Sequence, residues 1–272
     1  MSRLLNTTVH GSKECLPIVL LHGFMGASWE WNEVINQVFN DFFCITIDLP
    51  GHGKSIADKD ADDYSLAGAT EAVCHTLDSF NIKKSVLCGY SMGGRLALYL
   101  ASHRPERWQG IIAESASPGI KNFDQRQKRA EHDKAIAHQL IHQPFEDFLQ
   151  TWYNQPLFDS FKKNLTVYQT TLVSRRKNDP QELAKALYGM SIGHQKPLWQ
   201  DLAKSRIPIL SIAGEHDPKH RTITEEMGSL SKTIQTAIVS GAGHNVHVEK
   251  PHDYVHVIRD FIKGIYDNDS ME

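Results

Sequence analysis

The chain has 272 residues, of which 40% are hydrophobic and 22% charged, with a formal net charge of -3 at pH 7. This length and composition are ordinary for a globular protein with a sizeable core. The slight negative charge gives no electrostatic reason to expect a nucleic acid or an anionic membrane as partner, so we expect neither.

The N-terminal stretch turns polar after Leu5 and lacks the apolar segment of a signal peptide. No apolar run reaches the roughly 18 residues of a membrane span. The four cysteines lie far apart without a CxxC pair, so we expect buried free thiols in a reducing compartment and no metal site: Cys15, Cys44, Cys74 and Cys88. These features predict a cytoplasmic protein.

The first part of the chain alternates apolar runs with amphipathic stretches. The patterns predict strands at Pro17–Leu21, Phe42–Ile47, Ser85–Cys88 and Trp108–Ala113, and helices at Trp29–Phe39 (capped by Ser28), Tyr64–Phe80 and Ser91–His103. Apolar strands that alternate with helices are typical of a parallel sheet covered on both faces, whose site lies at the carboxyl ends of the strands. His22, Asp48 and Ser91 follow such ends.

The alternation stops after the fourth of these strands. Helical patterns then cover Lys121–Leu140 and Asn164–Lys177, five aromatic residues cluster from Phe145 to Phe158, and no strand is evident. We interpret residues 118–203 as a helical cap over the site, inserted into an α/β core domain that is formed by residues 1–117 and 204–272.

The alternation resumes beyond the cap. Strands are predicted at Pro208–Ala213 and Ile234–Val239, helices at Thr222–Leu230 and Tyr254–Ile265, and a frayed end at Asn268–Glu272. The expected fold class is therefore α/β, with a mostly parallel central sheet flanked by helices.

The segment Gly89-Tyr90-Ser91-Met92-Gly93 has the pattern G-x-S-x-G between a predicted strand and a predicted helix. Such a segment reverses the chain so sharply that the serine hydroxyl projects above the sheet, and glycines are needed because side chains would collide. Alone the pattern is weak, since chance would produce it in about one chain of this length in ten.

A serine hydroxyl becomes reactive when an imidazole takes its proton and a carboxylate fixes that imidazole. In a sheet with a serine elbow the expected chain order is Ser, Asp or Glu, then His. Asp217 and His244 follow successive predicted strands in this order. Singly, they could be a turn aspartate and a surface histidine, but together they favour a Ser91–Asp217–His244 triad. Neighbouring residues have the wrong offsets from the strand ends: Glu215, His216 and His247.

An oxyanion hole needs two backbone N–H groups that point at one position. Met92 follows the serine at the positive end of its helix, and Phe24 lies in the glycine-rich loop after the first strong strand, so we expect these two to supply the N–H groups. We interpret His22, in the same loop, as structural.

Arg95 lies four residues after Ser91, on the same face of a helix that should be buried under the site. A nearly buried arginine needs an anion. The anion is either a loop carboxylate in an internal salt bridge or a substrate carboxylate that is gripped bidentately. Four arginines of the cap could add to such a site or lie on a solvated face: Arg126, Arg129, Arg175 and Arg176.

Six motifs together resemble one known family. They are HGFMG (22–26), DLPGHG (48–53), GYSMGGR (89–95), ESASPG (114–119), WYNQPLF (152–158) and GEHD (214–217). The chain, from Pro17 to about Pro251, is similar to the bacterial 2-succinyl-6-hydroxy-2,4-cyclohexadiene-1-carboxylate synthases of menaquinone biosynthesis, which have the α/β-hydrolase fold. The elbow, the HG loop and the triad are common to the whole superfamily, whereas the arginine after the elbow and WYNQPLF are more specific.

The resemblance implies a lyase that eliminates pyruvate from 2-succinyl-5-enolpyruvyl-6-hydroxy-3-cyclohexene-1-carboxylate, with the triad as base. This small-molecule substrate carries three carboxylates, which would explain the arginines. By motif, the implied binding residues are Tyr90, Arg95, Arg129, Trp152 and Arg175, although a shift of one residue would exchange Arg175 with Arg176. No metal or organic cofactor is expected, and we expect a monomer or a weak homo-oligomer.

Two other functions remain open at this point. A serine hydrolase of carboxylic esters or of carbon–carbon bonds would share the fold and the triad, although an enzyme for neutral esters has no use for Arg95. A binding protein without catalysis would not need an intact triad. The serine at position 91 excludes a dehalogenase with an aspartate nucleophile.

Overall fold

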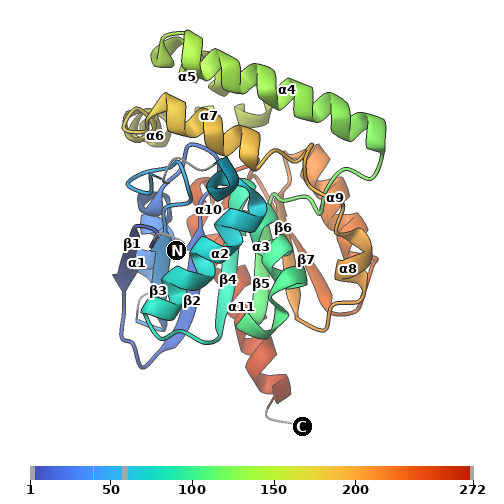
Figure 1. The fold of residues 1–272 in the computed structure, drawn as a ribbon. Helices are drawn as coiled ribbons and strands as arrows, with labels where there is room; N and C mark the ends of the chain where they lie inside the picture. Colours follow the sequence, from blue (N-terminus) through green and yellow to red (C-terminus); the bar gives the residue numbers. More distant parts are fainter. Residues whose placement is uncertain (1–3, 39, 57–60, 270–272) are drawn as a thin grey trace.

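A computed structural model describes residues 4–38, 40–56 and 61–269, and its centre is a seven-stranded sheet (Figure 1). The strands are β1 (Thr7–His10), β2 (Leu16–Leu21), β3 (Phe42–Ile47), β4 (Ser85–Tyr90), β5 (Trp108–Glu114), β6 (Ile209–Gly214) and β7 (Ile234–Val239). They lie in the order β1-β3-β2-β4-β5-β6-β7. Only β1, at the edge, is antiparallel to its neighbour. The predicted mostly parallel sheet is confirmed.

Helices cover both faces of this sheet, because successive side chains of a strand point to opposite faces. In β2, Val19 and Leu21 pack with α2 (Leu66–Ser79), α3 (Met92–His103), α8 (Trp199–Ala203) and α9 (Pro218–Gly228). Ile18 and Leu20 pack on the other face with α1 (Asn32–Val38), α10 (Val246–Glu249) and α11 (Pro251–Asp269). These four side chains are fully buried, which explains the unbroken apolar sequence of this part of β2.

Four longer helices lie between β5 and β6 and pass over the carboxyl ends of the strands (Figure 1). They are α4 (Phe123–His142), α5 (Phe145–Tyr153), α6 (Leu165–Arg175) and α7 (Pro180–Gly189). These helices share a hydrophobic cluster of their own, which includes Phe148 and Leu183. The stretch also ends in α8, whose Trp199 and Leu202 pack with the core cluster against α3.

Five short 3-10 helices complete the described chain: η1 (Ser28–Trp31), η2 (Ala61–Tyr64), η3 (Pro105–Arg107), η4 (Pro156–Phe158) and η5 (Phe161–Lys163). No helix within the described ranges is both long and apolar enough to cross a membrane. The cysteines are free; three are buried as expected, whereas Cys15 is only half-buried.

The structure differs from the sequence-based expectations in one edge strand and at the ends of several helices. The edge strand β1 was not expected, because it is polar and half exposed. Ser28 does not cap a helix; it begins η1, and its N–H and hydroxyl both donate to Asp48 Oδ1, at 2.6 and 2.5 Å. Phe39, the expected end of that helix, lies outside the described residues.

The two C-terminal helices also begin earlier than expected. The helix α9 begins at Pro218, and α11 runs from Pro251 to Asp269. The predicted frayed end therefore includes two helical residues, and residues 270–272 are not described.

Candidate active site

Ser91 stands at the sharp turn between β4 and α3. Its backbone has φ 50° and ψ -104°, a conformation that is strained for a residue with a side chain. A Cβ atom on Gly89 would lie 2.3 Å from the Gly93 carbonyl oxygen, and one on Gly93 would lie 2.4 Å from that of Leu21. Both glycines of the motif are therefore required, and the serine is presented at the carboxyl edge of the sheet.

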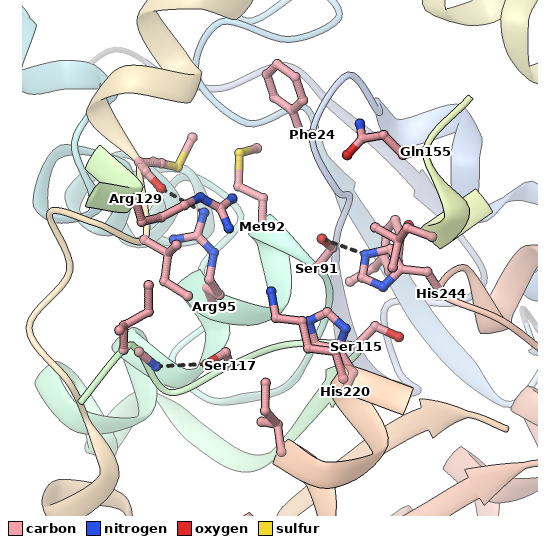
Figure 2. A pocket seen from close by; sticks show the side chains of 18 of the residues that line it. Phe24, Ser91, Met92, Arg95, Ser115, Ser117, Arg129, Gln155, His220 and His244 are labelled. Atoms are coloured by element: carbon pink, nitrogen blue, oxygen red, sulfur yellow. Dashed lines mark hydrogen bonds between the residues drawn. The ribbon is translucent and has the colours of Figure 1, made fainter. Parts of the chain in front are cut away.

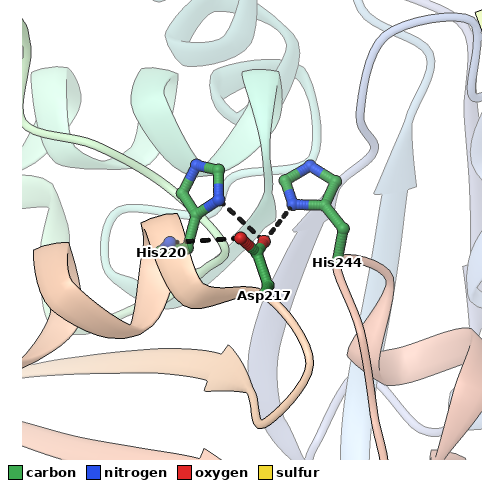
Figure 3. A group of neighbouring side chains, drawn as sticks. All are labelled: Asp217, His220 and His244. Atoms are coloured by element: carbon green, nitrogen blue, oxygen red, sulfur yellow. Dashed lines mark hydrogen bonds and ion pairs between the residues drawn. The ribbon is translucent and has the colours of Figure 1, made fainter. Parts of the chain in front are cut away.

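His244 and Asp217 complete a chain of hydrogen bonds from this serine. His244 Nε2 lies 3.2 Å from Ser91 Oγ, and His244 Nδ1 lies 2.6 Å from Asp217 Oδ2 (Figures 2 and 3). Burial alone would raise the pKa of Asp217, but hydrogen bonds from His220 and His244 outweigh it and hold that pKa well below its usual range. An ionised carboxylate only accepts, so Nδ1 of His244 carries a proton and Nε2 can take one from Ser91.

These groups face a cavity of about 650 Å³ between the sheet and the helices above it. Nine of the ten residues predicted for the site line it: Phe24, Tyr90, Ser91, Met92, Arg95, Arg129, Trp152, Arg175 and His244. The tenth, Asp217, lies behind His244 and is 1% exposed. The arrangement can abstract a proton or attack an acyl group from one position in the cavity wall.

The two N–H groups that we predicted for the oxyanion hole belong to residues of this wall. Met92 is the first residue of α3, where a backbone N–H has no intrahelical acceptor. No acceptor for the Phe24 N–H occurs among the described residues. His22 supports the loop before Phe24, since its Nε2 accepts from Leu49 N at 2.9 Å and its Nδ1 therefore donates to Gly23 O at 2.7 Å. This agrees with a structural role for His22.

Arg95 reaches the cavity without a carboxylate partner in the described part of the chain. Its Nη1 donates to Gln195 Oε1 at 3.2 Å and its Nη2 to the Met190 carbonyl at 2.7 Å, and both acceptors are neutral. Burial first, and then the nearby Arg129, lower the pKa of Arg95 to about 10, so it stays cationic at neutral pH. The internal salt bridge is therefore not formed, and the positive charge faces the cavity.

Arg129, on α4, points into the cavity near Arg95 (Figure 2). Its Nε donates to Asp133 Oδ1 at 2.7 Å, while Ser191 donates to the other oxygen of that carboxylate at 2.6 Å. Since the described residues engage only Nε, the two Nη groups of Arg129 remain as donors. Arg126, one turn earlier, bonds the carbonyls of its own N-terminal loop and does not line the cavity.

Arg175 and Arg176, at the end of α6, have opposite surroundings. Arg175 is buried, forms an ion pair with Glu30 and donates from Nε to Tyr153 Oη at 3.0 Å. Its Nη1 has no partner in the described structure. Arg176 is exposed and pairs with Glu146. Of the two, only Arg175 lines the cavity, and its charge is already balanced by Glu30.

The aromatic residues close the cavity from two sides. Trp152, on α5, meets the Phe24 ring edge-on at a centroid distance of 5.3 Å. Tyr90, the last residue of β4, packs against His244 at 5.4 Å. Trp152 therefore connects α5 with the loop after β2, and Tyr90 supports the imidazole.

Four polar residues that follow predicted strands in the sequence do not line the cavity: Asp48, Glu215, His216 and His247. Asp48 accepts hydrogen bonds from Ser28, Asn6 and Lys54 and organises the surrounding loops. His247 is fully buried against Glu114. Neither lines the cavity, nor do the exposed Glu215 and His216.

Several residues of the cavity wall were not predicted from the sequence, among them Ser115, Lys219 and His220. Burial, and then Arg129, lower the pKa of Lys219, which adds a third cation near Arg95. Ser115 Oγ is buried without a partner among the described residues. A signal existed for His220, because it lies three residues after Asp217 at the start of a helix and so shares its face.

Asp217, His220 and His244 also form the one group in the described ranges whose residue types and spacing suit a metal ion, with ligand atoms within 4.8 Å of one another. Both Nδ1 atoms lie within hydrogen-bond distance of Asp217 Oδ2, at 2.6 and 2.7 Å. Hydrogen bonding alone therefore accounts for this arrangement.

Comparison with known proteins adds to this geometry. The model of the alpha/beta hydrolase fold family matches residues 17–251. A 2-succinyl-6-hydroxy-2,4-cyclohexadiene-1-carboxylate synthase from Enterobacter sp. (strain 638) is 34% identical over 252 residues, covering 91% of this chain and 92% of the relative. The structure of MenH from S. aureus matches with a TM-score of 0.90 and 32% identity over 96% of this chain and 98% of that one. A thermophilic esterase from Thermogutta terrifontis (TM-score 0.83, 21% identity, 96% and 93% covered) shares the fold.

Proposed function

Because this chain belongs to the alpha/beta hydrolase fold family, among the 2-succinyl-6-hydroxy-2,4-cyclohexadiene-1-carboxylate synthases, we propose that it eliminates pyruvate with a Ser91–His244–Asp217 triad. It is a lyase of menaquinone biosynthesis. The observation that carries the catalytic proposal is the conjunction of two features in one cavity. These are the hydrogen-bonded chain that ends at Ser91 and the cationic Arg95, which has no carboxylate partner in the described structure.

The substrate and product define which bonds change. The substrate, 2-succinyl-5-enolpyruvyl-6-hydroxy-3-cyclohexene-1-carboxylate, has its ring double bond at C3, and the product has double bonds at C2 and C4. A proton must therefore leave C2, and the bond from C5 to the enolpyruvyl oxygen must break. The succinyl carbonyl attached to C2 acidifies that proton. The reaction thus needs a base for C2 and a site for the charge on the carbonyl oxygen.

The triad would supply the base. Ser91 Oγ takes the C2 proton while its own proton passes to His244 Nε2, and Asp217 stabilises the imidazolium. The N–H groups of Phe24 and Met92 stabilise the charge on the succinyl oxygen. The electrons then form the C2 and C4 double bonds, and enolpyruvate leaves and takes up a proton to become pyruvate. No acyl-enzyme forms.

The three carboxylates of the substrate suit the cations of the cavity. Arg95 and the Nη groups of Arg129 offer donors that no described carboxylate uses, and Arg175 offers its unpartnered Nη1. Trp152 and Tyr90 would pack against the ring and its substituents. A generic ester would not require these charges, so they favour a polyanionic substrate over the hydrolase alternative.

We extend the proposal to the organisation of the chain. Residues 118–203 act as the cap, and residues 1–117 and 204–272 act as the core. The protein is a cytoplasmic monomer or weak homo-oligomer, and it needs no metal or organic cofactor because base catalysis suffices for this elimination. The burial of three free thiols supports a reducing compartment.

Ser91→Ala tests the proposal. Pyruvate release from the enolpyruvyl cyclohexene substrate, followed in a coupled assay, should fall by at least about 10³-fold because the base is gone. Ser117→Ala, a serine of the same cavity outside the triad, is the matched control and should keep most activity. If Ser91→Ala releases pyruvate at a rate near that of the wild type, the triad does not act as the base.

A further inference from the structure

His220 shares the carboxylate of Asp217 with His244. Its Nδ1 lies 2.7 Å from the same Oδ2 atom that His244 Nδ1 approaches to 2.6 Å, and its backbone N–H donates to Oδ1 at 3.1 Å (Figure 3). The two rings lie with their centroids 4.8 Å apart. His220 therefore contacts the acid of the triad as closely as the base does, from the side of α9.

The chemistry of the three groups fixes which atoms carry protons. An ionised carboxylate has no proton to donate, so both histidines must donate their Nδ1–H to Oδ2. His220 is 8% exposed, and its pKa is lowered to about 4. Burial is the main cause, and the hydrogen bond to Asp217 opposes it without cancelling it. His220 is therefore a neutral imidazole at pH 7.

A neutral second donor changes what Asp217 does. The carboxylate is held by His220 through both oxygens, which fixes its plane toward His244 before any substrate binds. Part of its negative charge is also shared with the His220 N–H, so less of it stabilises the imidazolium form of His244. We propose that His220 is a positioning residue that orients Asp217 for His244 and limits how strongly Asp217 favours the protonated base.

Other charged groups near His220 act in the same direction or lie farther away. Lys219 lowers the pKa of His220, as His244 does, while Asp217 raises it. Arg95 on α3 and Arg129 on α4 lower the pKa of Lys219 across the cavity. Asp217 and Asp133 oppose these cations at Lys219. At His220 itself, burial outweighs the effect of Asp217, which supports a neutral His220 at neutral pH.

The inference rests on the proposed triad but not on the proposed substrate, and one pair of variants tests it. His220→Asn and His220→Gln carry the same amide, but only the shorter side chain places an N–H where Nδ1 of the imidazole stood. His216→Gln, at an exposed histidine of the turn just before α9, is the matched control. Thermal unfolding of each variant verifies that it is folded.

The readout is the pH dependence of Ser91 labelling by a fluorophosphonate, in which Ser91 Oγ displaces fluoride from phosphorus and its proton passes to His244. We expect His220→Asn to label within about threefold of the wild type. We expect His220→Gln to lose about tenfold, with the acid limb of its profile moved up by about one pH unit, as for the loss of one hydrogen bond to a charged group. His216→Gln should match the wild type.

The proposal is overturned if the two amide variants behave alike, or if the acid limb of His220→Gln stays where it is in the wild type. Pyruvate release is recorded in parallel. A wild type that is labelled but releases no pyruvate contradicts the lyase function and leaves the comparison of the two amides intact.

Discussion

Arg95 and Arg175 reach the same cavity, one from α3 and one from α6, but their charges are balanced differently. Arg175 is 2% exposed and forms an ion pair with Glu30, which is 1% exposed. Among the described residues, the side chain of Arg95 bonds only the neutral oxygens of Gln195 and Met190. The charge of Arg175 is thus neutralised within the protein, whereas the charge of Arg95 remains available to an anionic ligand in the cavity.

This difference suggests separate roles: the Arg175–Glu30 pair for the stability of the fold, and Arg95 for the binding of an anionic ligand. A buried ion pair recovers the cost of desolvation only when both partners are present, so Arg175 and Glu30 depend on each other. Together they join α6 to η1. A cation that is held by neutral acceptors is oriented but not neutralised, so it favours an anionic ligand. Stability should therefore respond to the first site, and catalysis to the second.

The largest effect is expected from Glu30→Gln. The substitution leaves the Arg175 guanidinium buried without a counter-ion, which should lower the free energy of unfolding by about 3 kcal/mol. Urea unfolding of the wild type and the variant measures it. Glu146→Gln is the matched control, because it removes the exposed partner of the adjacent Arg176 and should leave stability nearly unchanged. Equal effects of both variants would contradict a structural role for the Arg175 pair.

Arg95→Ala should act mainly on the substrate. We expect kcat/KM for pyruvate release to fall by about 30-fold, the value of a charged hydrogen-bond pair to a carboxylate, while turnover of p-nitrophenyl acetate changes by less than about threefold. Arg126→Ala, on α4 but outside the cavity, should change neither activity. If Arg95→Ala damages both substrates equally, the residue supports the elbow and does not bind the carboxylate.

The smallest effect is expected for the stability of the protein at acidic pH. Burial alone would raise the pKa of Glu30, but Arg175, with smaller contributions from His247 and His22, holds it below its ordinary value of 4.5. Since the folded pKa lies below the unfolded one, this stabilisation is complete above the unfolded pKa and is lost as the pH falls through the folded one.

The difference in unfolding free energy between the wild type and Glu30→Gln should therefore be constant from about pH 7 to about pH 5 and shrink below about pH 4.5. Urea unfolding at a series of pH values measures this difference. A difference that grows in acid would show that Glu30 is protonated in the folded protein.

The elbow and the order of its partners were predictable because they depend on local pattern. Glycines around a serine and polar residues directly after apolar strands are visible in the sequence, and parallel strands bring their carboxyl ends together. The edge strand β1 escaped prediction because its residues are polar and its place is set by pairing with β3. Ser28 was predicted to cap a helix, but its hydroxyl donates a hydrogen bond to Asp48 instead.

Charge balance was not predictable, since the partners are distant in sequence. Arg175 and Glu30 lie 145 positions apart, and nothing near either residue indicates the pairing. For Arg95, its spacing from Ser91 allowed both an internal salt bridge and a contact with a substrate carboxylate. The neutral acceptors at Met190 and Gln195 distinguish the two. The spacing of His220 from Asp217 could be seen in the sequence. Its role became apparent only from the structure, in which Nδ1 of His220 and Nδ1 of His244 both approach Asp217 Oδ2.

The most direct test of the central claim is to measure, in one reaction in H₂¹⁸O, the pyruvate and the conjugated diene that the wild type forms from the enolpyruvyl cyclohexene substrate. Elimination predicts one pyruvate per diene and no ¹⁸O in any carboxylate of the ring product. In Ser91→Ala, the formation of pyruvate and of the diene should both be lost. Release of succinate that carries ¹⁸O, without formation of the diene, would show hydrolysis of a carbon–carbon bond and contradict the account.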